Sequence, residues 1–357
     1  MTLPRVRFWI FNYMPQWEGV SQELASVRDG LREQVDGSIV SLDTKQRAWA
    51  LRGRDKRIPL PHGLALYPLI RSWVGRAEVN HLFASAGERW LTPLLGRYDG
   101  VLTVAKDTPG PLAYERNAES FRRLRAVVVQ SERDREILGR FGLRPGALRL
   151  IRPGVALAPY RAARGPFTIL FASSPLTAGH FRSRGVHLIV GAAARLPDVR
   201  FLLVWRRRHV DRLRRMLAEA GVTNVEILDG VVPDMGAVYD RVHATILPAL
   251  EPHSFIPCPR SGLESLAHGK PLLASHAVDL ASGVAEAGAG LAFEPTVAAL
   301  EQVIRRLQAD YDAYQSRTQP YVTRRFSPAV HLELYRRLYG VTSAPAQVPR
   351  ARAVSRP

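Results

Sequence analysis

Short apolar runs alternate with amphipathic segments through the first half of the chain. Apolar runs of four to six residues predict buried strands, and segments with apolar residues three or four positions apart predict helices. The predicted strands span residues 6–11, 37–42, 100–104, 126–130 and 148–151, and the clearest helices span residues 20–31 and 132–141. A strand, a loop and a helix in this order form the opening unit of a parallel α/β sheet.

A second alternation begins after residues 155–166, which lose periodicity and contain two prolines and a glycine. Strands are predicted at 167–172, 201–205, 225–228, 244–248, 271–274 and 290–292, with helices over 186–196, 208–220, 234–240 and 296–339. We therefore expect two α/β domains with parallel, doubly wound sheets, one at residues 1–157 and one at 158–328. We also expect a C-terminal helix at 329–340 that returns to the N-terminal domain, and a disordered tail at 341–357.

Composition narrows the class of protein. The chain has 357 residues, of which 46% are hydrophobic, so two hydrophobic cores are expected. Its single cysteine, Cys258, excludes an internal disulfide framework and a cysteine-rich metal site, and fits a reducing, cytoplasmic setting. We see no signal peptide, no transmembrane stretch and no zinc-ligand spacing, so we expect no bound metal.

The formal charge of +18 raises the question of a polyanionic partner. The excess is spread over both halves and is almost all arginine, so we interpret the local clusters as solvated faces and do not expect nucleic acid as a partner. Peripheral attachment of the protein to an anionic membrane surface is the alternative interpretation of the charge. The clusters are Arg52, Arg54, Lys56 and Arg57; Arg122, Arg123 and Arg125; and Arg206, Arg207, Arg208, Arg212, Arg214 and Arg215.

Residues 257–273 carry the most informative motif. They predict a loop, a helix that begins near Ser261, and a buried strand, with Ser261 as the N-cap and Glu264 three residues later. The exposed amides of a first helical turn bind anions, and a carboxylate beside them is suited to a ribose diol. This pattern favours a nucleotide diphosphate site; an ordinary capping box without a ligand is the alternative.

A second candidate anion site follows the predicted strand at 167–172. Ser173 and Ser174 come directly after the strand, and Arg182, Arg184 and Gly185 precede the next helix. A guanidinium binds phosphate oxygens in a fork, and a glycine lets the backbone approach them closely. The alternative is a solvent-facing arginine pair at a helix start.

Three blocks of the second half resemble family 4 of the retaining glycosyltransferases, also called glycosyl transferases group 1, which have the GT-B fold. The blocks are residues 184–189 with 199–204, residues 230–233 with Tyr239 and 244–248, and residues 259–271. Residues 127–132 and 152–155 resemble the end of that family's first domain. The resemblance implies two facing Rossmann-like domains, with the acceptor bound by the N-terminal domain and the nucleotide sugar by the C-terminal domain.

The resemblance also implies the reaction: transfer of a sugar, most simply a hexose, from a nucleotide diphosphate, with retention and without a metal or other cofactor. The implied catalytic residues are Arg184, on the diphosphate, and Glu264, on the ribose. The other implied donor-binding residues are Ser173, Ser174, Arg182, Gly230, Val231, Val232, Pro259, Ser261, Gly262 and Leu263. The expected acceptor is a glycan or a lipid-linked saccharide.

The chain departs from the family pattern at several positions. Many members have a second glutamate eight residues before the one that matches Glu264, and here this position is Ile256.

The candidates in the N-terminal domain follow from loop position alone: Gly19, His81 after a short apolar strand, and Lys106 with Asp107 at the end of another strand. A core or surface histidine, and an ion-pair or capping role for Lys106 and Asp107, are the alternatives.

Two other functions fit the same sequence features. A nucleotide-sugar epimerase of similar fold would need no acceptor. A non-catalytic protein on this scaffold would bind polyanions with strong salt dependence and would not bind nucleotide diphosphates.

Overall fold

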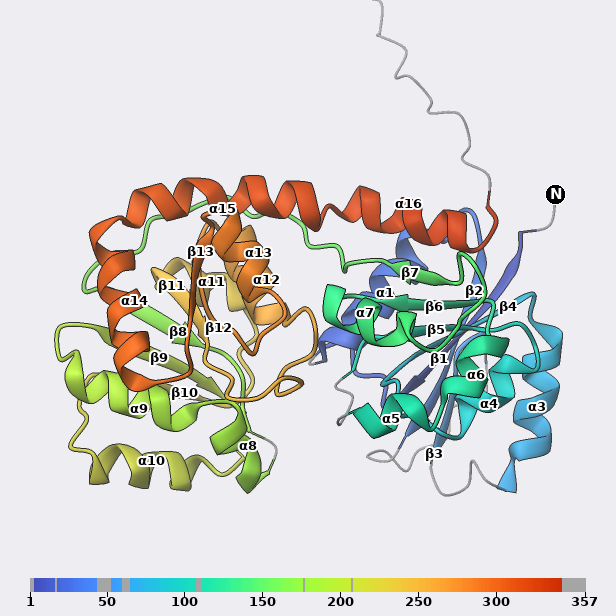
Figure 1. Cartoon of the computed structure of the whole chain (residues 1–357), viewed down its shortest axis with the longest axis horizontal. Helices are drawn as coiled ribbons and strands as arrows, with labels where there is room; N and C mark the ends of the chain where they lie inside the picture. Colours follow the sequence, from blue (N-terminus) through green and yellow to red (C-terminus); the bar gives the residue numbers. More distant parts are fainter. Residues whose placement is uncertain are drawn as a thin grey trace, which may run out of the picture.

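The computed structural model describes residues 3–16, 18–43, 53–59, 65–106, 111–175, 177–206 and 208–341. The chain forms two α/β domains side by side, each built on one parallel sheet with helices on its faces (Figure 1). The expected architecture of two doubly wound parallel sheets is confirmed. The predicted disordered tail lies outside the described residues from residue 342 onward.

The N-terminal sheet has seven strands in the order β3-β2-β1-β4-β5-β6-β7. Its strands are β1 (Arg5–Phe11), β2 (Asp36–Asp43), β3 (Lys56–Pro59), β4 (Val79–Ala84), β5 (Val101–Val104), β6 (Ala126–Val129) and β7 (Leu148–Leu150). The helices are α1 (Gly19–Gly30), α3 (Tyr67–Arg76), α4 (Leu91–Gly96), α5 (Pro111–Glu115), α6 (Ala118–Arg123) and α7 (Glu132–Gly139). Successive strand side chains point to opposite faces, so the sheet separates two apolar clusters.

The C-terminal sheet has six strands in the order β10-β9-β8-β11-β12-β13. Its strands are β8 (Thr168–Phe171), β9 (Arg200–Trp205), β10 (Val225–Asp229), β11 (Ala244–Leu247), β12 (Leu272–Ser275) and β13 (Gly290–Phe293). The helices are α8 (Ala178–Ser183), α9 (Val186–Arg195), α10 (Val210–Glu219), α11 (Met235–Asp240), α12 (Arg260–Ala267), α13 (Ala281–Glu286) and α14 (Val297–Ala309).

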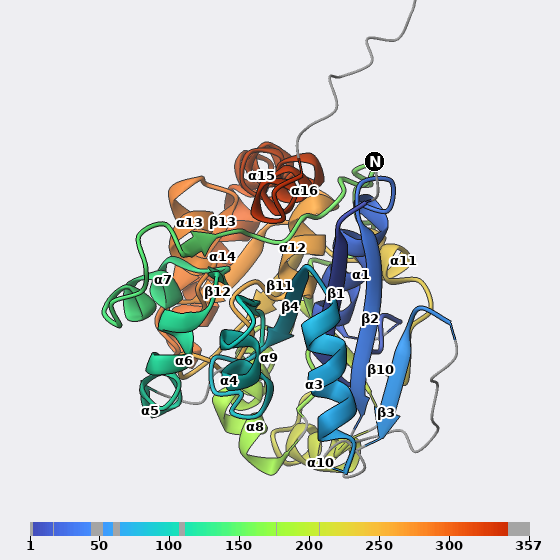
Figure 2. The same ribbon diagram turned by 90° about the vertical axis from the view of Figure 1, so that its right-hand side faces the viewer.

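Two segments cross between the domains. Residues 151–167 form the first crossing and have no regular structure. The second crossing is made by α15 (Tyr311–Arg325) and α16 (Pro328–Leu338), which run along the same edge of both domains in Figures 1 and 2. The buried side chains of Tyr335 and Tyr339 belong to the N-terminal core, so the chain ends its described part on the domain where it began.

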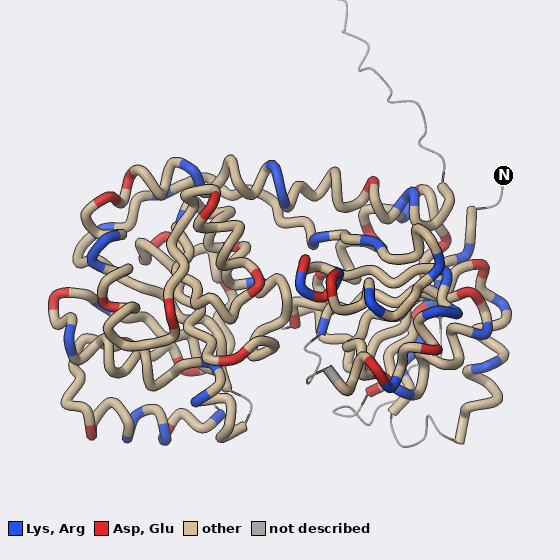
Figure 3. Tube along the Cα trace, viewed as in Figure 1, with Lys and Arg blue, Asp and Glu red and all other residues tan. Residues whose placement is uncertain are grey.

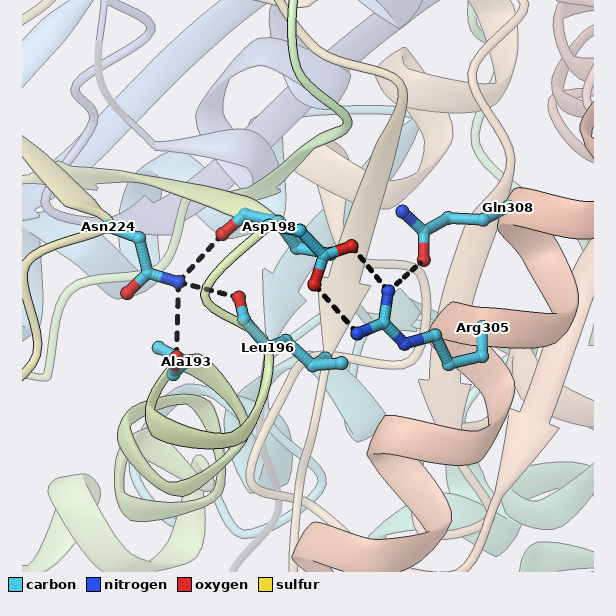
Figure 4. A network of polar contacts seen from close by, with 7 residues as sticks. Ala193, Leu196, Asp198, Asn224, Arg305 and Gln308 are labelled. Carbon is cyan, nitrogen blue, oxygen red and sulfur yellow. Dashed lines mark hydrogen bonds and ion pairs between the residues drawn. The ribbon is translucent and has the colours of Figure 1, made fainter.

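A polar network closes the turn between α9 and β9 (Figure 4). The Nδ2 group of Asn224 donates to the carbonyl oxygens of Ala193 (3.1 Å), Leu196 (2.8 Å) and Val199 (2.7 Å). Arg305 on α14 donates to both carboxylate oxygens of Asp198, and this bond lowers the pKa of Asp198. These contacts satisfy the last carbonyl groups of α9 and hold the amino end of β9, which is the edge of the sheet opposite to the loops discussed below.

The structure corrects several predicted elements. The sequence pattern missed β3 and β4. Lys56 and Arg57 of the first basic cluster lie on strand β3, and Arg52 of this cluster lies outside the described residues. Arg57 reaches the buried carboxylate of Asp43 at 2.9 Å. The short helix α8 also precedes α9, so Arg184 follows one helix and does not open the next.

Candidate functional site

Each sheet has one point where the strand order changes direction. In the N-terminal sheet this point lies between β1 and β4, and in the C-terminal sheet it lies between β8 and β11. The loops after neighbouring strands diverge there, which leaves a crevice at the carboxyl ends of the strands, and ligands of open α/β sheets bind in such crevices. The candidate residues around Arg184 and Glu264 follow β8 and β11, and Gly19 follows β1.

The segments that follow β1 and β11 meet at the domain boundary. A Cβ atom on Gly19 would lie 3.4 Å from Cβ of Arg260 and 3.9 Å from Cδ1 of Ile256. The start of α1 therefore lies against the start of α12. A cavity of about 380 Å³ opens nearby between the domains, with Gln130 on one side and Cys258 on the other. A larger cavity of about 800 Å³ lies at the amino ends of β8 to β10, away from these loops.

Arg184 is held between the two loops of the C-terminal crevice. Its Nη1 group donates to Oγ of Ser173 at 2.9 Å and to the carbonyl oxygen of Ser174 at 3.0 Å. The guanidinium carbon lies 5.5 Å from the centre of the Phe255 ring, on the loop that leads to α12. The side chain is therefore fixed at the crevice, whereas Arg182 is exposed on α8.

Gly185 brings these two loops into direct contact. Its φ of +69° lies in the left-handed region, and a Cβ atom there would lie 1.8 Å from the carbonyl oxygen of Pro248, just after β11. The amide of Leu250 donates to the carbonyl oxygen of Ser183 at 2.8 Å. Only glycine allows this approach, so the residue after Arg184 is required by the geometry of the crevice.

Helix α12 begins one residue earlier than predicted, at Arg260, and its N-cap is Pro259. The prediction that Ser261 caps the helix is wrong, because Ser261 lies inside the first turn and its side chain makes no capping bond. The amides of Gly262 and Leu263 donate to the carbonyl oxygen of Pro259, and both residues pack inward. Within the described residues, the amides of Arg260 and Ser261 have no acceptor, so they are the two available to an anion.

Glu264 does not form a capping box; other side chains hold its carboxylate. Arg260 donates from Nε to Oε1 at 2.9 Å, and Tyr239 donates from its hydroxyl to Oε2 at 3.3 Å. The Tyr239 hydroxyl also donates to the carbonyl oxygen of Ser261 at 3.1 Å, and its ring stacks on His268 with centroids 4.7 Å apart. Burial raises the pKa of Tyr239 well above its ordinary value, so the phenol keeps its proton.

The loop at residues 230–234 borders the crevice on the side of β9 and β10. The amide of Gly230 donates to the carbonyl oxygen of Trp205 at 2.6 Å, with φ at 133°. Val231 is 61% exposed, and Val232 packs against the small apolar cluster around Tyr239. The exposed apolar side chain of Val231 is therefore accessible to a planar group in a ligand.

Lys106 ties down the first loop of the N-terminal domain. Its Nζ donates to the carbonyl oxygen of Phe11 at 2.9 Å and lies 3.2 Å from Oε1 of Glu18. The hydroxyl of Ser21 donates to the other carboxylate oxygen of Glu18 at 2.8 Å. Lys106 therefore positions the residues that precede Gly19. Asp107, the other candidate at this strand end, lies outside the described residues.

His81 is a core residue and not a cleft residue. It lies within β4 instead of after a strand, and it is fully buried. Its Nδ1 is hydrogen-bonded to the hydroxyl of Tyr339 and its Nε2 to Oγ1 of Thr103, both at 2.7 Å. Burial lowers the pKa of His81 to about 3, so the ring is neutral at ordinary pH. The expectation that it faces the cleft is wrong, and the core alternative is confirmed.

The structure adds two residues near the domain boundary to those that the sequence singled out for the site. Arg206 follows β9, and its amide donates to Oγ of Ser174 at 2.7 Å. Partial burial lowers the pKa of Arg206, and the carboxylate of Glu18 in the other domain opposes this shift. Arg206 is exposed, as expected for its solvated basic cluster, and its place directly after a strand brings its amide to the loop that also holds Arg184.

Glu23 is the second of these residues. It lies on α1, is 5% exposed, and accepts hydrogen bonds from Nε2 of Gln130 at 2.8 and 2.7 Å. Desolvation raises the pKa of Glu23 to about 7, and Gln130 and Arg260 only partly oppose this. The thiol of Cys258 donates to the carbonyl oxygen of Gln130 at 3.6 Å, so a residue of the C-terminal domain contacts the partner of Glu23. A glutamate on an amphipathic helix gave no sign of burial in the sequence.

In the described part of the chain, neither the charge distribution nor a metal-binding group nor a membrane-spanning helix marks this site. Figure 3 shows basic and acidic residues intermixed over both domains, without a face of one sign in that view. Within the described ranges, no group of three or more His, Cys, Asp or Glu side chains is placed to hold a metal ion. In the same part of the chain, no helix is long and apolar enough to cross a membrane.

Comparison with known proteins places this geometry in a class. Residues 168–310 match the family glycosyl transferases group 1. No curated protein sequence matches the chain.

Solved structures share the fold over nearly the whole chain. HepE from Anabaena, in complex with UDP and glucose, has a TM-score of 0.75 at 14% identity, with 94% of this chain and 99% of that chain covered. Sucrose-phosphate synthase from Thermosynechococcus elongatus has a TM-score of 0.74 at 15% identity, with the same coverage. WaaG, described as a glycosyltransferase of lipopolysaccharide biosynthesis, has a TM-score of 0.67 at 14% identity, with 92% and 99% covered. Likeness at these identities establishes the fold.

The fold and the family match together define the class: the chain is a glycosyltransferase with the GT-B fold. Residues 168–310 of its C-terminal domain match glycosyl transferases group 1. The resemblance to family 4, noted from residues 184–271, is consistent with this assignment.

Proposed function

We propose that this protein transfers a hexosyl group from a nucleotide diphosphate to a glycan or a lipid-linked saccharide, with retention at the anomeric carbon and without a metal ion. The observation that carries the proposal is that a fixed guanidinium follows β8 and a fixed carboxylate follows β11, at the point where the strand order of the C-terminal sheet changes direction. Arg184 lies between α8 and α9 and is followed by Gly185, which contacts Pro248 after β11, and Glu264 lies on α12, the helix that follows β11.

The carboxylate of Glu264 suits a ribose diol. A carboxylate has two oxygens with about four acceptor positions in all. Arg260 uses one position on Oε1 and Tyr239 uses one on Oε2, which leaves an acceptor position on each oxygen for neighbouring hydroxyl groups. The side chain is 24% exposed, so these positions are accessible.

The diphosphate would lie between Arg184 and the first turn of α12. The free amides of Arg260 and Ser261 and the dipole of the eight-residue helix favour negative charge there. The same donors would stabilise the charge that develops on the diphosphate as the glycosidic bond breaks, which is the step a metal ion assists in other enzymes. Val231 and the loop from Gly230 would border the base, and Gly19 would let the N-terminal backbone approach the phosphates.

The donor half of the proposal is tested by thermal stabilisation with UDP, GDP, ADP and dTDP. A ligand that binds only the native state raises its melting temperature, so one of these compounds should stabilise the wild type. Arg184→Ala and Glu264→Ala should each remove most of this stabilisation. Arg241→Ala and Glu226→Ala are matched controls, because this pair is half exposed on the same domain, outside the crevice. Equal stabilisation of all variants would contradict the site.

The reaction half is tested with the matching nucleotide sugar. Chromatography of the donor incubated alone would reveal an epimerase by a rearranged nucleotide sugar. With an acceptor, proton NMR of the newly formed linkage reports the anomeric configuration, and inversion would contradict the proposed mechanism. Turnover that survives EDTA is expected, and loss of turnover that Mg²⁺ or Mn²⁺ restores would refute metal independence.

A further inference from the structure

We infer that Arg260 is a positioning residue that orients Glu264 for the ribose and ties this carboxylate to the crossing between the domains. The inference rests on the proposed nucleotide site and adds a residue that the family resemblance does not assign. Arg260 acts through Glu264 and through the backbone, and it needs no contact with the donor's reacting atoms.

The Arg260 side chain makes three separate contacts. Nε donates to Oε1 of Glu264 at 2.9 Å, one helical turn away. Nη1 donates to the carbonyl oxygen of Gly154 at 3.4 Å. The aliphatic stem lies against Gly19, where a Cβ atom would be 3.4 Å from Cβ of Arg260 and 4.0 Å from its Cγ. One side chain therefore contacts Glu264, which is the proposed ligand of the ribose, the first crossing segment, and the first helix of the opposite domain.

Gly154 lies where the two crossing segments meet. A Cβ atom on Gly154 would be 2.8 Å from Cα of Pro328, the first residue of α16. His331 on α16 is hydrogen-bonded through Nδ1 to the carbonyl oxygen of Arg152 at 2.7 Å. The first crossing segment is therefore packed against the start of α16, which belongs to the second crossing. The bond from Arg260 to Gly154 therefore links the orientation of Glu264 to the relative position of the domains.

Only an arginine satisfies both acceptors at once. The planar guanidinium presents several donors in a fixed fork, so one nitrogen can hold the carboxylate while another holds the carbonyl group. A lysine ammonium would keep the positive charge, but as a single point at the end of a flexible stem. With 31% of its side chain exposed, Arg260 is shielded enough for this geometry to matter and open enough to respond to domain movement.

The experiment compares affinities for ribose and dideoxyribose forms of the same ligand. Isothermal titration would use UDP, GDP and ADP, each beside its 2′,3′-dideoxy counterpart, on wild type, Arg260→Met and Arg260→Lys. Hydrogen bonds to a charged carboxylate predict a wild-type preference of about 10- to 100-fold for the ribose form. Arg260→Met should reduce this preference to about 2-fold, and Arg260→Lys should give an intermediate value, because charge alone restores only part of the geometry.

A second background isolates the route through Glu264. In Glu264→Gln, the further change Arg260→Met should not alter the ribose preference, since residues that act as a unit show non-additive effects. Arg140→Met is the matched control: Arg140 also forms an i,i+4 pair, with Glu136 at 2.6 Å, on an exposed helix of the other domain. It should leave both affinities unchanged.

The outcomes separate the inference from the function on which it rests. If wild type prefers the ribose form and Arg260→Met keeps the full preference, the inference is overturned and the nucleotide site stands. If Arg260→Met weakens both forms equally, the residue has a general structural role and the inference is also overturned. If wild type binds neither the six compounds nor dTDP, the proposed function itself fails, and the inference fails with it. Binding of dTDP alone overturns the inference and leaves the nucleotide site standing.

Discussion

Replacing the buried glutamate on α1 by its neutral isostere should stabilise the protein at neutral and alkaline pH. Glu23 is 5% exposed and receives hydrogen bonds from Gln130 and from Tyr335, with Cys258 and Arg260 of the other domain close by. Desolvation raises the pKa of Glu23 from 4.5 to about 7, so ionising it in the folded protein costs free energy. The substitution Glu23→Gln keeps the size of the side chain and removes the charge.

The sign and size follow from proton linkage. Between pH 4.5 and about 7 the folded state binds the Glu23 proton more tightly than the unfolded state, so the free energy of unfolding falls as pH rises. Each pH unit across this interval is worth about 1.4 kcal/mol, which gives a total of about 3 kcal/mol. The stabilisation of Glu23→Gln relative to wild type should therefore grow by about 3 kcal/mol between pH 4.5 and pH 8, and stay constant above.

Urea denaturation of both proteins at several pH values measures this difference directly. Comparing the variant with wild type at each pH cancels the titration of all other groups. Glu136→Gln, at an exposed pair with Arg140, is the control and should show a difference under about 1 kcal/mol without this pH trend. A Glu23→Gln difference that is flat with pH, or that grows toward acid, would refute the burial argument.

Two further substitutions test the crevice and the core. Gly185→Ala should destabilise the protein by about 3 kcal/mol or more, because Cβ would lie 1.8 Å from the carbonyl oxygen of Pro248. The control Gly221→Ala, at a similar positive φ with open space around it, should cost about 1 kcal/mol. Similar losses of stability in thermal unfolding of the two variants would contradict the close-approach argument. His81→Leu should cost about 1–3 kcal/mol in chemical denaturation by removing the partner of the Tyr339 hydroxyl, and it should leave nucleoside diphosphate affinity unchanged, so a selective loss of binding would return His81 to the site.

Local pattern predicted most strands that are apolar throughout, and failed where polar residues are buried. Strand β4 was missed as an element because Asn80 and His81 interrupt its apolar run. In the fold these side chains are satisfied from a distance: Trp9 donates to Oδ1 of Asn80 at 3.0 Å, and Tyr339 contacts His81. A buried polar group costs little once it is hydrogen-bonded, but the partners are far away in sequence and leave no periodic trace.

The sequence by itself determined the two parallel sheets, their order along the chain, and the loops that carry Arg184 and Glu264. These features depend on apolar periodicity, on turn residues and on short motifs, all of which are local. Only the tertiary structure decided that α12 begins at Arg260 with Pro259 as its N-cap, that Glu23 is desolvated, and that Arg260 joins Glu264 to Gly154. The contacts of Glu23 with Gln130 and of Arg260 with Gly154 join residues about a hundred positions apart, so their geometry follows from tertiary packing and not from any pattern along the chain.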